Sequence, residues 1–222
     1  MSIEIITTGD GSHSLLNTAL NETYHSRHGA VQESRHVFIQ EGLDRFLASG
    51  ATTVAVLEVG FGTGLNALLT AQHAEEKDVT VQYTSLETAP LPEDLWMQLN
   101  YSTSPAAQTL FHAIHQAPWN QPVAVRPTFQ LQKLTISLQD ATLPVAQTDV
   151  IYFDAFAPNK QPEMWTYDML AKAVQTLRPG GMFVTYCAKG QLKRDLKALG
   201  LTVETLPGPP GKKEMVRGVR SV

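Results

Sequence analysis

The chain has 222 residues, which is enough for one large domain or for one domain with an appendage. Its hydrophobic content of 43% is that of an ordinary packed core. A single cysteine excludes an internal disulfide, and no apolar run is long enough to cross a bilayer. The N-terminus has neither a basic region nor a long apolar stretch, so we expect no signal peptide and a cytoplasmic protein.

The charge of the chain is unevenly distributed. A net charge of -4 does not by itself indicate a nucleic-acid-binding protein. From Lys189 to the C-terminus, however, there are eight basic and three acidic residues, so this segment carries +5 and the remainder -9. The segment is either a solvated helix face with a basic tail or a local patch that contacts RNA phosphates.

The first fifty residues precede the repeating pattern of the rest. Residues 3–6 and 14–16 flank a Gly-Asp-Gly turn, which predicts a β-hairpin. Residues 24–30 are polar and predict a loop, whereas residues 33–47 show the helical spacing of apolar side chains. We expect this segment to pack over one end of a sheet formed by the rest of the chain.

From residue 51 onward, strands and helices alternate. Strands are predicted at residues 54–60, 79–87, 129–137, 149–154, 182–187, 201–206 and 215–220. Helices are predicted at residues 64–75, 92–100, 105–115, 162–177 and 191–199. This order predicts an α/β fold with a doubly wound, mostly parallel sheet and one antiparallel strand near the C-terminus. The chain would then consist of an N-terminal hairpin and helix, residues 1–50, and an α/β domain, residues 51–222.

One turn of this pattern carries a ligand-binding signature. Residues 57–64 read Leu-Glu-Val-Gly-Phe-Gly-Thr-Gly and lie between a predicted buried strand and a helix. Glycines at such a turn let a ligand approach the backbone and the free N–H groups of the helix N-terminus. A dinucleotide site would have a third glycine where Leu65 stands, and no phosphate-loop motif is present. Glu58 suits an ammonium or sulfonium, which is the charge pattern of S-adenosylmethionine.

Acidic residues stand at or after the ends of four predicted strands. They are Glu58, Glu87, Asp140 and Asp154. Because ligands of doubly wound sheets bind at the carboxyl ends of the strands, we expect all four to lie along one edge. Glu87 can accept hydrogen bonds from both hydroxyls of a ribose, and Asp140 with Ala141 can meet an adenine amino group.

The segment Asp154-Ala155-Phe156-Ala157-Pro158 follows an entirely apolar strand. Asp154 is the predicted catalytic residue, since its carboxylate can hold an amine and take its proton while the amine displaces a methyl group from a sulfonium. Phe156 offers a flat face for a nucleobase, and Pro158 stiffens the loop. The alternative is that Asp154 only caps the following helix.

Two other chemistries have weaker support. Cys187 could act as the nucleophile that methylation of a pyrimidine carbon requires, but a lone cysteine in a strand is more often a packing residue. The seven histidines show no spacing typical of metal ligands, so we predict no metal site.

Several segments, taken together, resemble the tRNA 5-aminomethyl-2-thiouridine methyltransferase family. This family comprises the methyltransferase halves of the bifunctional wobble-uridine modification proteins and their stand-alone relatives. The resemblance rests on residues 24–30, 33–38, 57–66, 154–166 and 209–215. The glycine loop is generic, whereas the Asp-Ala-Phe-Ala-Pro and Gly-Lys-Lys-Glu-Met segments are much more specific.

The resemblance implies a Rossmann-like class I methyltransferase fold, S-adenosylmethionine as donor, and the aminomethyl group on the wobble uridine, in the anticodon region of tRNA, as acceptor. The expected donor-binding residues are Tyr24, Ser26, Glu58, Gly60, Phe61, Gly62, Thr63, Gly64, Asn66, Glu87, Asp140, Ala141 and Asp154. The expected substrate-binding residues are Phe156, Pro158, Lys212 and Lys213. Bifunctional members carry a flavin-dependent oxidase domain that this sequence lacks, so we expect a separate enzyme to generate the amine.

Three other functions remain open at this point. A small-molecule methyltransferase or an aminopropyltransferase would use the same fold on free amines. A cofactor-binding module without catalysis would tolerate the loss of Asp154. A nicotinamide dehydrogenase is disfavoured by Leu65 and by the lack of an acid suited to hydride transfer.

Overall fold

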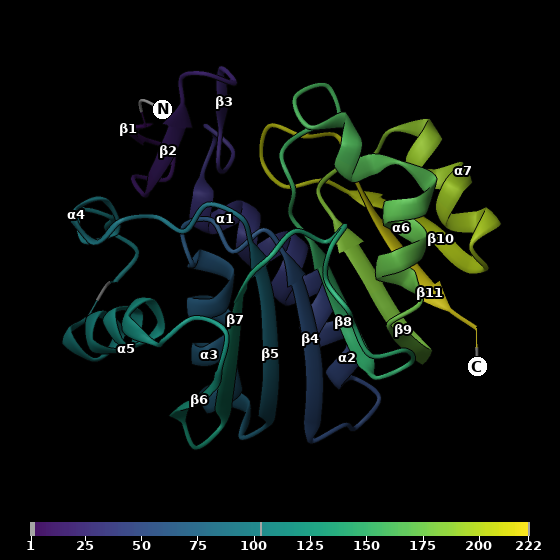
Figure 1. Cartoon of the computed structure of the whole chain (residues 1–222), viewed down its shortest axis with the longest axis horizontal. Helices are drawn as coiled ribbons and strands as arrows, with labels where there is room; N and C mark the ends of the chain where they lie inside the picture. The colour runs from purple at the N-terminus through teal and green to yellow at the C-terminus, as the bar shows by residue number, and fades with distance from the viewer. Residues whose placement is uncertain (1–2, 103, 222) are drawn as a thin grey trace.

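A twisted eight-stranded sheet organises the chain in the computed structural model, which describes residues 3–102 and 104–221 (Figure 1). The strand order is β10-β11-β9-β8-β4-β5-β7-β6. The strands are β4 (Thr53–Val59), β5 (Thr80–Glu87), β6 (Pro122–Arg126), β7 (Phe129–Thr135), β8 (Thr148–Phe153), β9 (Leu177–Thr185), β10 (Leu201–Pro207) and β11 (Glu214–Arg220). The five strands β7, β5, β4, β8 and β9 run parallel. The predicted doubly wound α/β fold is therefore confirmed.

The predicted antiparallel strand near the C-terminus is β11. It lies between β9 and β10 and pairs with both of them. A second antiparallel strand, β6, pairs with β7 at the opposite edge and was not predicted. Prolines stand at the start of β6 and directly after it, and its apolar run is only Val123-Ala124-Val125. This short edge strand gives too weak an alternation to be found from the sequence.

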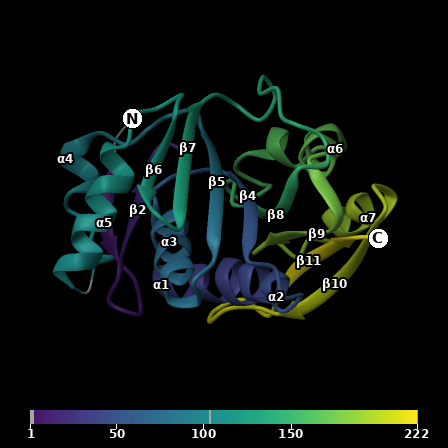
Figure 2. The ribbon, with the colours of Figure 1, turned by 90° about the horizontal axis from the view of Figure 1, so that it is seen from below.

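Helices cover both faces of the sheet (Figure 2). They are α1 (Ala30–Ser34), the π-helix η1 (Arg35–Asp44), α2 (Arg45–Leu47), α3 (Leu65–Lys77), α4 (Glu93–Trp96), α5 (Pro105–Gln116), the 3-10 helix η2 (Pro162–Trp165), α6 (Tyr167–Val174) and α7 (Gly190–Ala198). Alternate side chains of β8 lie on opposite faces of the sheet. Val150 and Tyr152 pack with the helices of residues 30–77, and Ile151 and Phe153 pack with α6 and α7.

Three predicted boundaries were wrong. The helix expected over residues 162–177 is interrupted at Thr166, whose hydroxyl accepts a hydrogen bond from the Met169 N–H and begins α6. The helix expected over residues 92–100 is a single turn. Strand β9 begins five residues before its predicted start. Residues 178–181, which were predicted to end the preceding helix, belong to the strand, and the pairing with β8 is irregular there.

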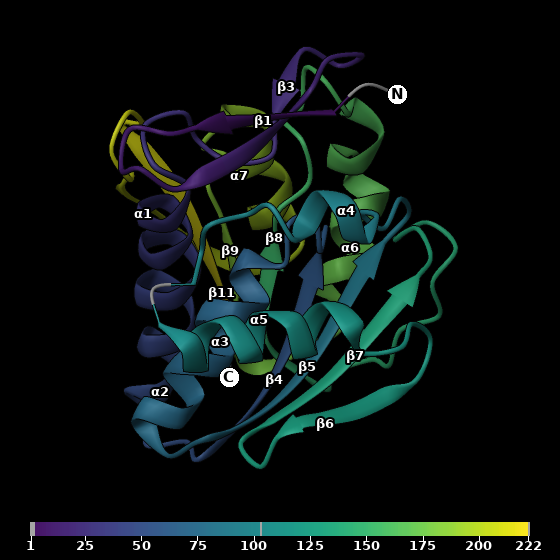
Figure 3. The same cartoon turned by 90° about the vertical axis from the view of Figure 1, so that its left-hand side faces the viewer.

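The segment before the sheet has two parts. Strands β1 (Ile3–Thr7), β2 (His13–Asn17) and β3 (Glu22–Thr23) form a small antiparallel sheet that lies across the carboxyl ends of the parallel strands (Figure 3). The continuous helical segment of residues 30–47 instead packs on one face of the large sheet. Its Gly42 allows this approach, since a Cβ there would lie 3.0 Å from Val184. The division of the chain at residue 50 stays a prediction.

Phe38 ties this helical segment to the sheet. Its side chain is 1% exposed, and its ring centroid lies 5.1 Å from that of Tyr152. We predict that Phe38→Ala lowers the free energy of unfolding by about 3–5 kcal/mol, because a large buried ring would be lost. Urea denaturation measures this loss. Tyr167→Ala, which removes an exposed ring, should change it by less than about 0.5 kcal/mol. Equal effects of the two variants would contradict the assignment of Phe38 to the core.

Candidate active site

A cavity of about 1240 Å³ opens at the carboxyl ends of the central strands. Its walls include the glycine loop, Glu87 at the end of β5, residues 137–139 after β7 and Asp154 after β8. The small N-terminal sheet supplies a further wall, through Ile3, Leu16 and Glu22 among others. Pockets for one small molecule usually measure about 300–1,000 Å³, so this cavity has room for two reactants.

The glycine loop takes backbone conformations that favour glycine. Gly60 and Gly62, which line the cavity, have φ angles of 97° and 50°. A Cβ on Gly60 would lie 2.8 Å from the Asp154 carbonyl oxygen, and one on Gly62 would lie 3.2 Å from the Tyr24 ring. The Gly62 N–H donates a 2.9 Å hydrogen bond to Glu87, which fixes the loop against the end of β5. Gly60 and Gly62 are therefore needed for the close packing of the loop against Asp154 and Tyr24, and the approach of a ligand to the loop backbone stays a prediction.

Two histidines that were not predicted as site residues contact Thr63 of the glycine loop. His25 Nε2 lies 2.7 Å from the Thr63 hydroxyl, and His115 Nε2 donates to the Thr63 carbonyl oxygen over 3.1 Å. Burial lowers the pKa of His25 to about 4 and that of His115 to about 3. Both rings are therefore neutral near pH 7, so that they position Thr63 without adding charge beside the cavity.

Behind the cavity, a buried hydrogen-bond network joins two carboxyl groups. The Asn66 side-chain amide donates to Glu58 Oε1 over 3.0 Å and to Asp154 Oδ2 over 2.9 Å. Ser85 donates to Glu58 Oε2 over 2.6 Å. Glu58 is fully buried, and burial raises its pKa to about 8. Burial, and then the Glu33 carboxylate, raise the pKa of Asp154 to about 7.

The loop that carries Asp154 is fixed by its own contacts. The Phe156 ring meets the Tyr24 ring edge to face, with centroids 5.0 Å apart, and both residues line the cavity. Trp165 donates to the Phe156 carbonyl oxygen over 2.7 Å. The alternative that Asp154 caps the following helix is wrong, because Thr166 caps α6 and the Asp154 carboxylate accepts its hydrogen bond from Asn66.

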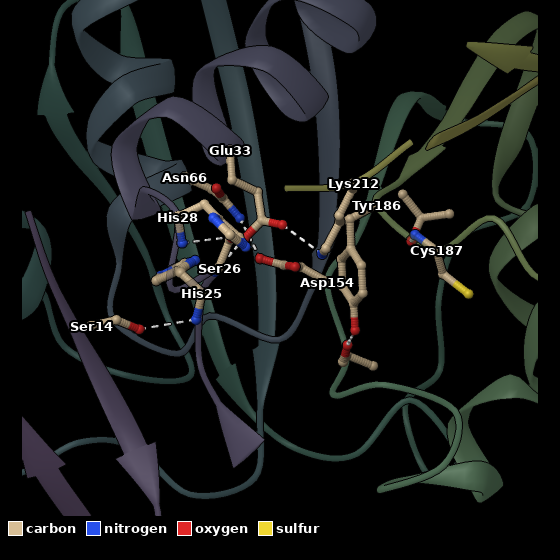
Figure 4. A network of polar contacts seen from close by, with 12 residues as sticks. Ser14, His25, Ser26, His28, Glu33, Asn66, Asp154, Tyr186, Cys187 and Lys212 are labelled. Atoms are coloured by element: carbon tan, nitrogen blue, oxygen red, sulfur yellow. Dashed lines mark hydrogen bonds and ion pairs between the residues drawn. The ribbon is translucent and has the colours of Figure 1, made fainter. Parts of the chain in front are cut away.

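A second charged cluster lies on the other side of Asp154 (Figure 4). Lys212 Nζ lies 2.6 Å from Glu33 Oε1 and 3.7 Å from the centroid of the Tyr186 ring. The Tyr186 hydroxyl donates to the Ala155 carbonyl oxygen over 2.8 Å. Lys212 is therefore engaged within the cavity wall, whereas Lys213 is exposed and has no side-chain partner among residues 3–102 and 104–221.

Some predicted site residues lie outside the cavity wall. Asp140 is exposed and accepts a 2.7 Å hydrogen bond from Ser137, so that it stands beside the wall formed by residues 137–139. The lining residues do not include Glu58, Gly64, Asn66, Asp140, Ala141, Pro158 or Lys213. Ser26 lines the cavity and donates its N–H to Glu33 over 2.7 Å. The role of each of these residues toward a ligand stays a prediction.

Cys187 packs in the core on the side of α6 and α7. It is 5% exposed, does not line the cavity, and burial raises the pKa of its thiol. This environment disfavours the thiolate that a nucleophile would need. In the part of the chain that the structure describes, no group of three or more His, Cys, Asp or Glu side chains could hold a metal ion, and no helix could span a membrane.

A family model described as S-adenosyl-L-methionine-dependent methyltransferase matches residues 104–221. The chain belongs to this methyltransferase family. Its donor is accordingly S-adenosylmethionine. The cavity suits such a donor, because Gly60 and Gly62 line it and Glu87 and Asp154 add two carboxyl groups to its walls, where a molecule with ammonium and sulfonium charges would bind.

Two curated relatives are similar over most of the chain. The tRNA 5-methylaminomethyl-2-thiouridine biosynthesis bifunctional protein MnmC of Pseudomonas aeruginosa (strain UCBPP-PA14) is 32% identical over 91% of the chain. The protein of the same name from Cupriavidus necator is 33% identical over 88% of the chain. The chain spans about a third of the length of these relatives, 33% and 31%.

Solved structures show the same fold. The crystal structure of MnmC2 from Aquifex aeolicus superposes with a TM-score of 0.81 at 24% identity and covers 98% of this chain and 70% of that one. Spermidine synthase from Thermotoga maritima gives a TM-score of 0.55 at 12% identity, with 95% and 68% coverage. At these identities the likeness concerns the fold.

The buried Glu58 makes stability depend on pH. Its pKa is raised from 4.5 to about 8, so folding takes up a proton in this window, and its contribution to the free energy of unfolding falls as pH rises. We predict that this loss, about 1.4 kcal/mol per pH unit between pH 5 and 8, disappears in Glu58→Gln. Urea denaturation at several pH values measures the difference between the two slopes. Exposed Glu93→Gln is the control, and parallel curves for wild type and Glu58→Gln would contradict the prediction.

Proposed function

We propose that the protein methylates the amine of an aminomethyl group on the wobble uridine of tRNA, and so converts 5-aminomethyl-2-thiouridine into 5-methylaminomethyl-2-thiouridine. The observation that carries this proposal is a carboxylate, Asp154, which stands beside the glycine loop of a methyltransferase in a cavity large enough for two reactants. The similarity to the MnmC proteins over about nine tenths of the chain supports the choice of acceptor, since their name specifies the methylated product.

S-adenosylmethionine supplies a methyl group on a positively charged sulfur, which becomes a neutral thioether when an amine nitrogen takes the methyl group. For its binding we propose the glycine loop together with Glu87 as the ribose contact and the Asp140-Ala141 turn as the adenine contact. Glu87 supports this role because it already lies at the cavity wall and is held by the N–H groups of Gly62, Thr88 and Ala89.

Asp154 prepares the acceptor. An alkylamine is largely protonated near neutral pH, and only the neutral amine has the lone pair that the reaction requires. The Asp154 carboxylate can hold the ammonium in the cavity and accept its proton, because a pKa of about 7 lets it exchange a proton at neutral pH. Asn66 holds the Oδ2 atom from behind, so that the carboxylate keeps a fixed orientation.

Phe156 and Tyr24 offer aromatic surfaces for the uracil ring. Both line the cavity near Asp154, and Trp165 and Gln161 hold the backbone of Phe156. Stacking of a base on such a ring contributes about 1–3 kcal/mol. The proposal also requires a tRNA that already carries the aminomethyl group, which a separate reaction must supply.

Asp154→Asn keeps the shape of the side chain and removes its basic carboxylate. We predict that methyl transfer to tRNA carrying aminomethyluridine falls by about 10²–10⁴-fold, the usual contribution of a general base. A radiolabelled methyl-transfer assay measures this loss, with exposed Asp94→Asn as the control. Near-normal transfer by Asp154→Asn would contradict the proposed role of Asp154 as the general base.

The acceptor itself is tested in cells. Mass analysis of wobble nucleosides should show accumulated aminomethyl nucleoside when the gene is deleted, and its disappearance when the wild-type gene is restored. Unchanged nucleosides, together with methyl transfer to free amines in vitro, would instead indicate a small-molecule enzyme. Complementation by Asp154→Asn would indicate a cofactor-binding module without catalysis.

Lys213 is the exposed lysine of the loop between β10 and β11. If it contacts a tRNA phosphate, Lys213→Ala should weaken binding and reduce the slope of log affinity against log salt by about one. Filter binding of tRNA over a range of salt concentrations measures the slope. Lys77→Ala changes an exposed lysine at the C-terminal end of α3 and should leave it unchanged. Equal slopes for Lys213→Ala and wild type would contradict a phosphate contact and indicate that Lys213 is only solvated.

A further inference from the structure

Three segments that are far apart in the sequence meet beside Asp154. Glu33 comes from α1, Tyr186 follows β9, and Lys212 comes from the loop between β10 and β11. All three line the same cavity as Asp154, and Figure 4 shows them grouped around its carboxylate. Glu33 was not among the predicted site residues, and Lys212 was predicted to bind the substrate.

The geometry of this cluster is fixed. Glu33 is 5% exposed, and its two carboxylate oxygens have separate partners, the Ser26 N–H at 2.7 Å and Lys212 Nζ at 2.6 Å. Lys212 also lies over the Tyr186 ring, at 3.7 Å from its centroid. Tyr186 in turn donates to the carbonyl oxygen of Ala155, the residue after Asp154. The ion pair is therefore tied to the backbone of the catalytic loop.

Close packing keeps Lys212 in this position. Gly211, the preceding residue, has a φ of +85°, and a Cβ on it would lie 2.0 Å from the His28 ring. The loop of residues 26–29 and the loop between β10 and β11 are thus in direct contact beside the cavity. Glu33 lies in α1, which follows the loop of residues 26–29. Its ion pair with Lys212 is therefore a second contact between the same two parts of the chain.

We propose that Glu33 and Lys212 are positioning residues for methyl transfer, which set the charge state of Asp154 through opposite charges placed beside it. The inference rests on the proposed role of Asp154 as the base. The Glu33 carboxylate favours the protonated form of Asp154, and the Lys212 ammonium favours its ionised form. Because they form a pair, their opposing effects are held together in one wall of the cavity.

Other ionisable groups surround Asp154 and do not change in the test. Those that line the cavity or lie in the network behind it are Glu22 of β3, Tyr24, His25 and Arg27 of the following loop, Glu58 of β4, Tyr83 and Glu87 of β5, Lys160 and Glu163 after β8, Asp168 of α6 and Tyr186 after β9, and Cys187 lies in the core beside Tyr186. Glu58 is linked to Asp154 through one residue, because the Asn66 side-chain amide donates a hydrogen bond to each of the two carboxyl groups.

The test compares three variants by the pH dependence of kcat/KM for tRNA methylation. In Glu33→Gln the side chain can still accept from Ser26 but leaves Lys212 unopposed, so the acidic limb should move down by about one pH unit. The double variant Glu33→Gln with Lys212→Met should return the limb toward the wild-type position. Lys212→Arg retains the charge and should leave the limb in place. The titration of the acceptor amine is the same in all assays, so any shift belongs to the protein.

Two further measurements keep the outcomes distinct. Arg126→Met breaks an ion pair with Glu75 whose arginine is 29% exposed, close to the 31% of Lys212, and should not move the limb. Carbon-13 NMR of the Asp154 carboxyl, identified by its absence in Asp154→Asn, measures the same shift in the free protein and does not depend on the acceptor. A loss of rate at every pH without movement of the limb or of the NMR midpoint would overturn the inference. Transfer that survives Asp154→Asn would overturn the proposed base instead.

Discussion

The structure depends on the placement of two carboxyl groups at the ends of neighbouring buried strands. Glu58 is the penultimate residue of β4 and Asp154 follows β8, so the parallel pairing of these strands brings both groups to the same region. A single amide, from Asn66, hydrogen-bonds to both. Burying two like charges is expensive, and burial raises the pKa of both groups, that of Glu58 to about 8 and that of Asp154 to about 7.

The rest of the cavity follows from that arrangement. The glycine loop follows β4 and packs against the backbone of Asp154, where Gly60 fits only because it has no side chain. Segments from both ends of the chain then complete the walls, with Tyr24 against Phe156 and Lys212 against Glu33. The contacts that form the walls of the cavity therefore also hold the loop that carries Asp154.

Much of this could be predicted from local patterns. The alternation of strands and helices predicts the parallel sheet, and the rule that ligands bind at strand ends predicts that Glu87 and Asp154 lie along one cavity. Contacts between distant segments could not be predicted. Nothing near His25 or His115 indicates Thr63, and nothing in the Gly-Lys-Lys-Glu-Met segment indicates that Lys212 pairs with Glu33 rather than with solvent. Pairing across such separations is set by packing, which one sequence does not reveal.

The small N-terminal sheet has a practical consequence for protein engineering. The large sheet is complete without it, so a shortened version that starts at residue 30 would retain every strand of the large sheet and the helical segment of residues 30–47 that packs on one of its faces. It would nonetheless lose Leu16, Glu22 and Tyr24 from the walls of the cavity. The smallest unit that retains the intact reaction chamber is therefore larger than the smallest unit that retains the sheet.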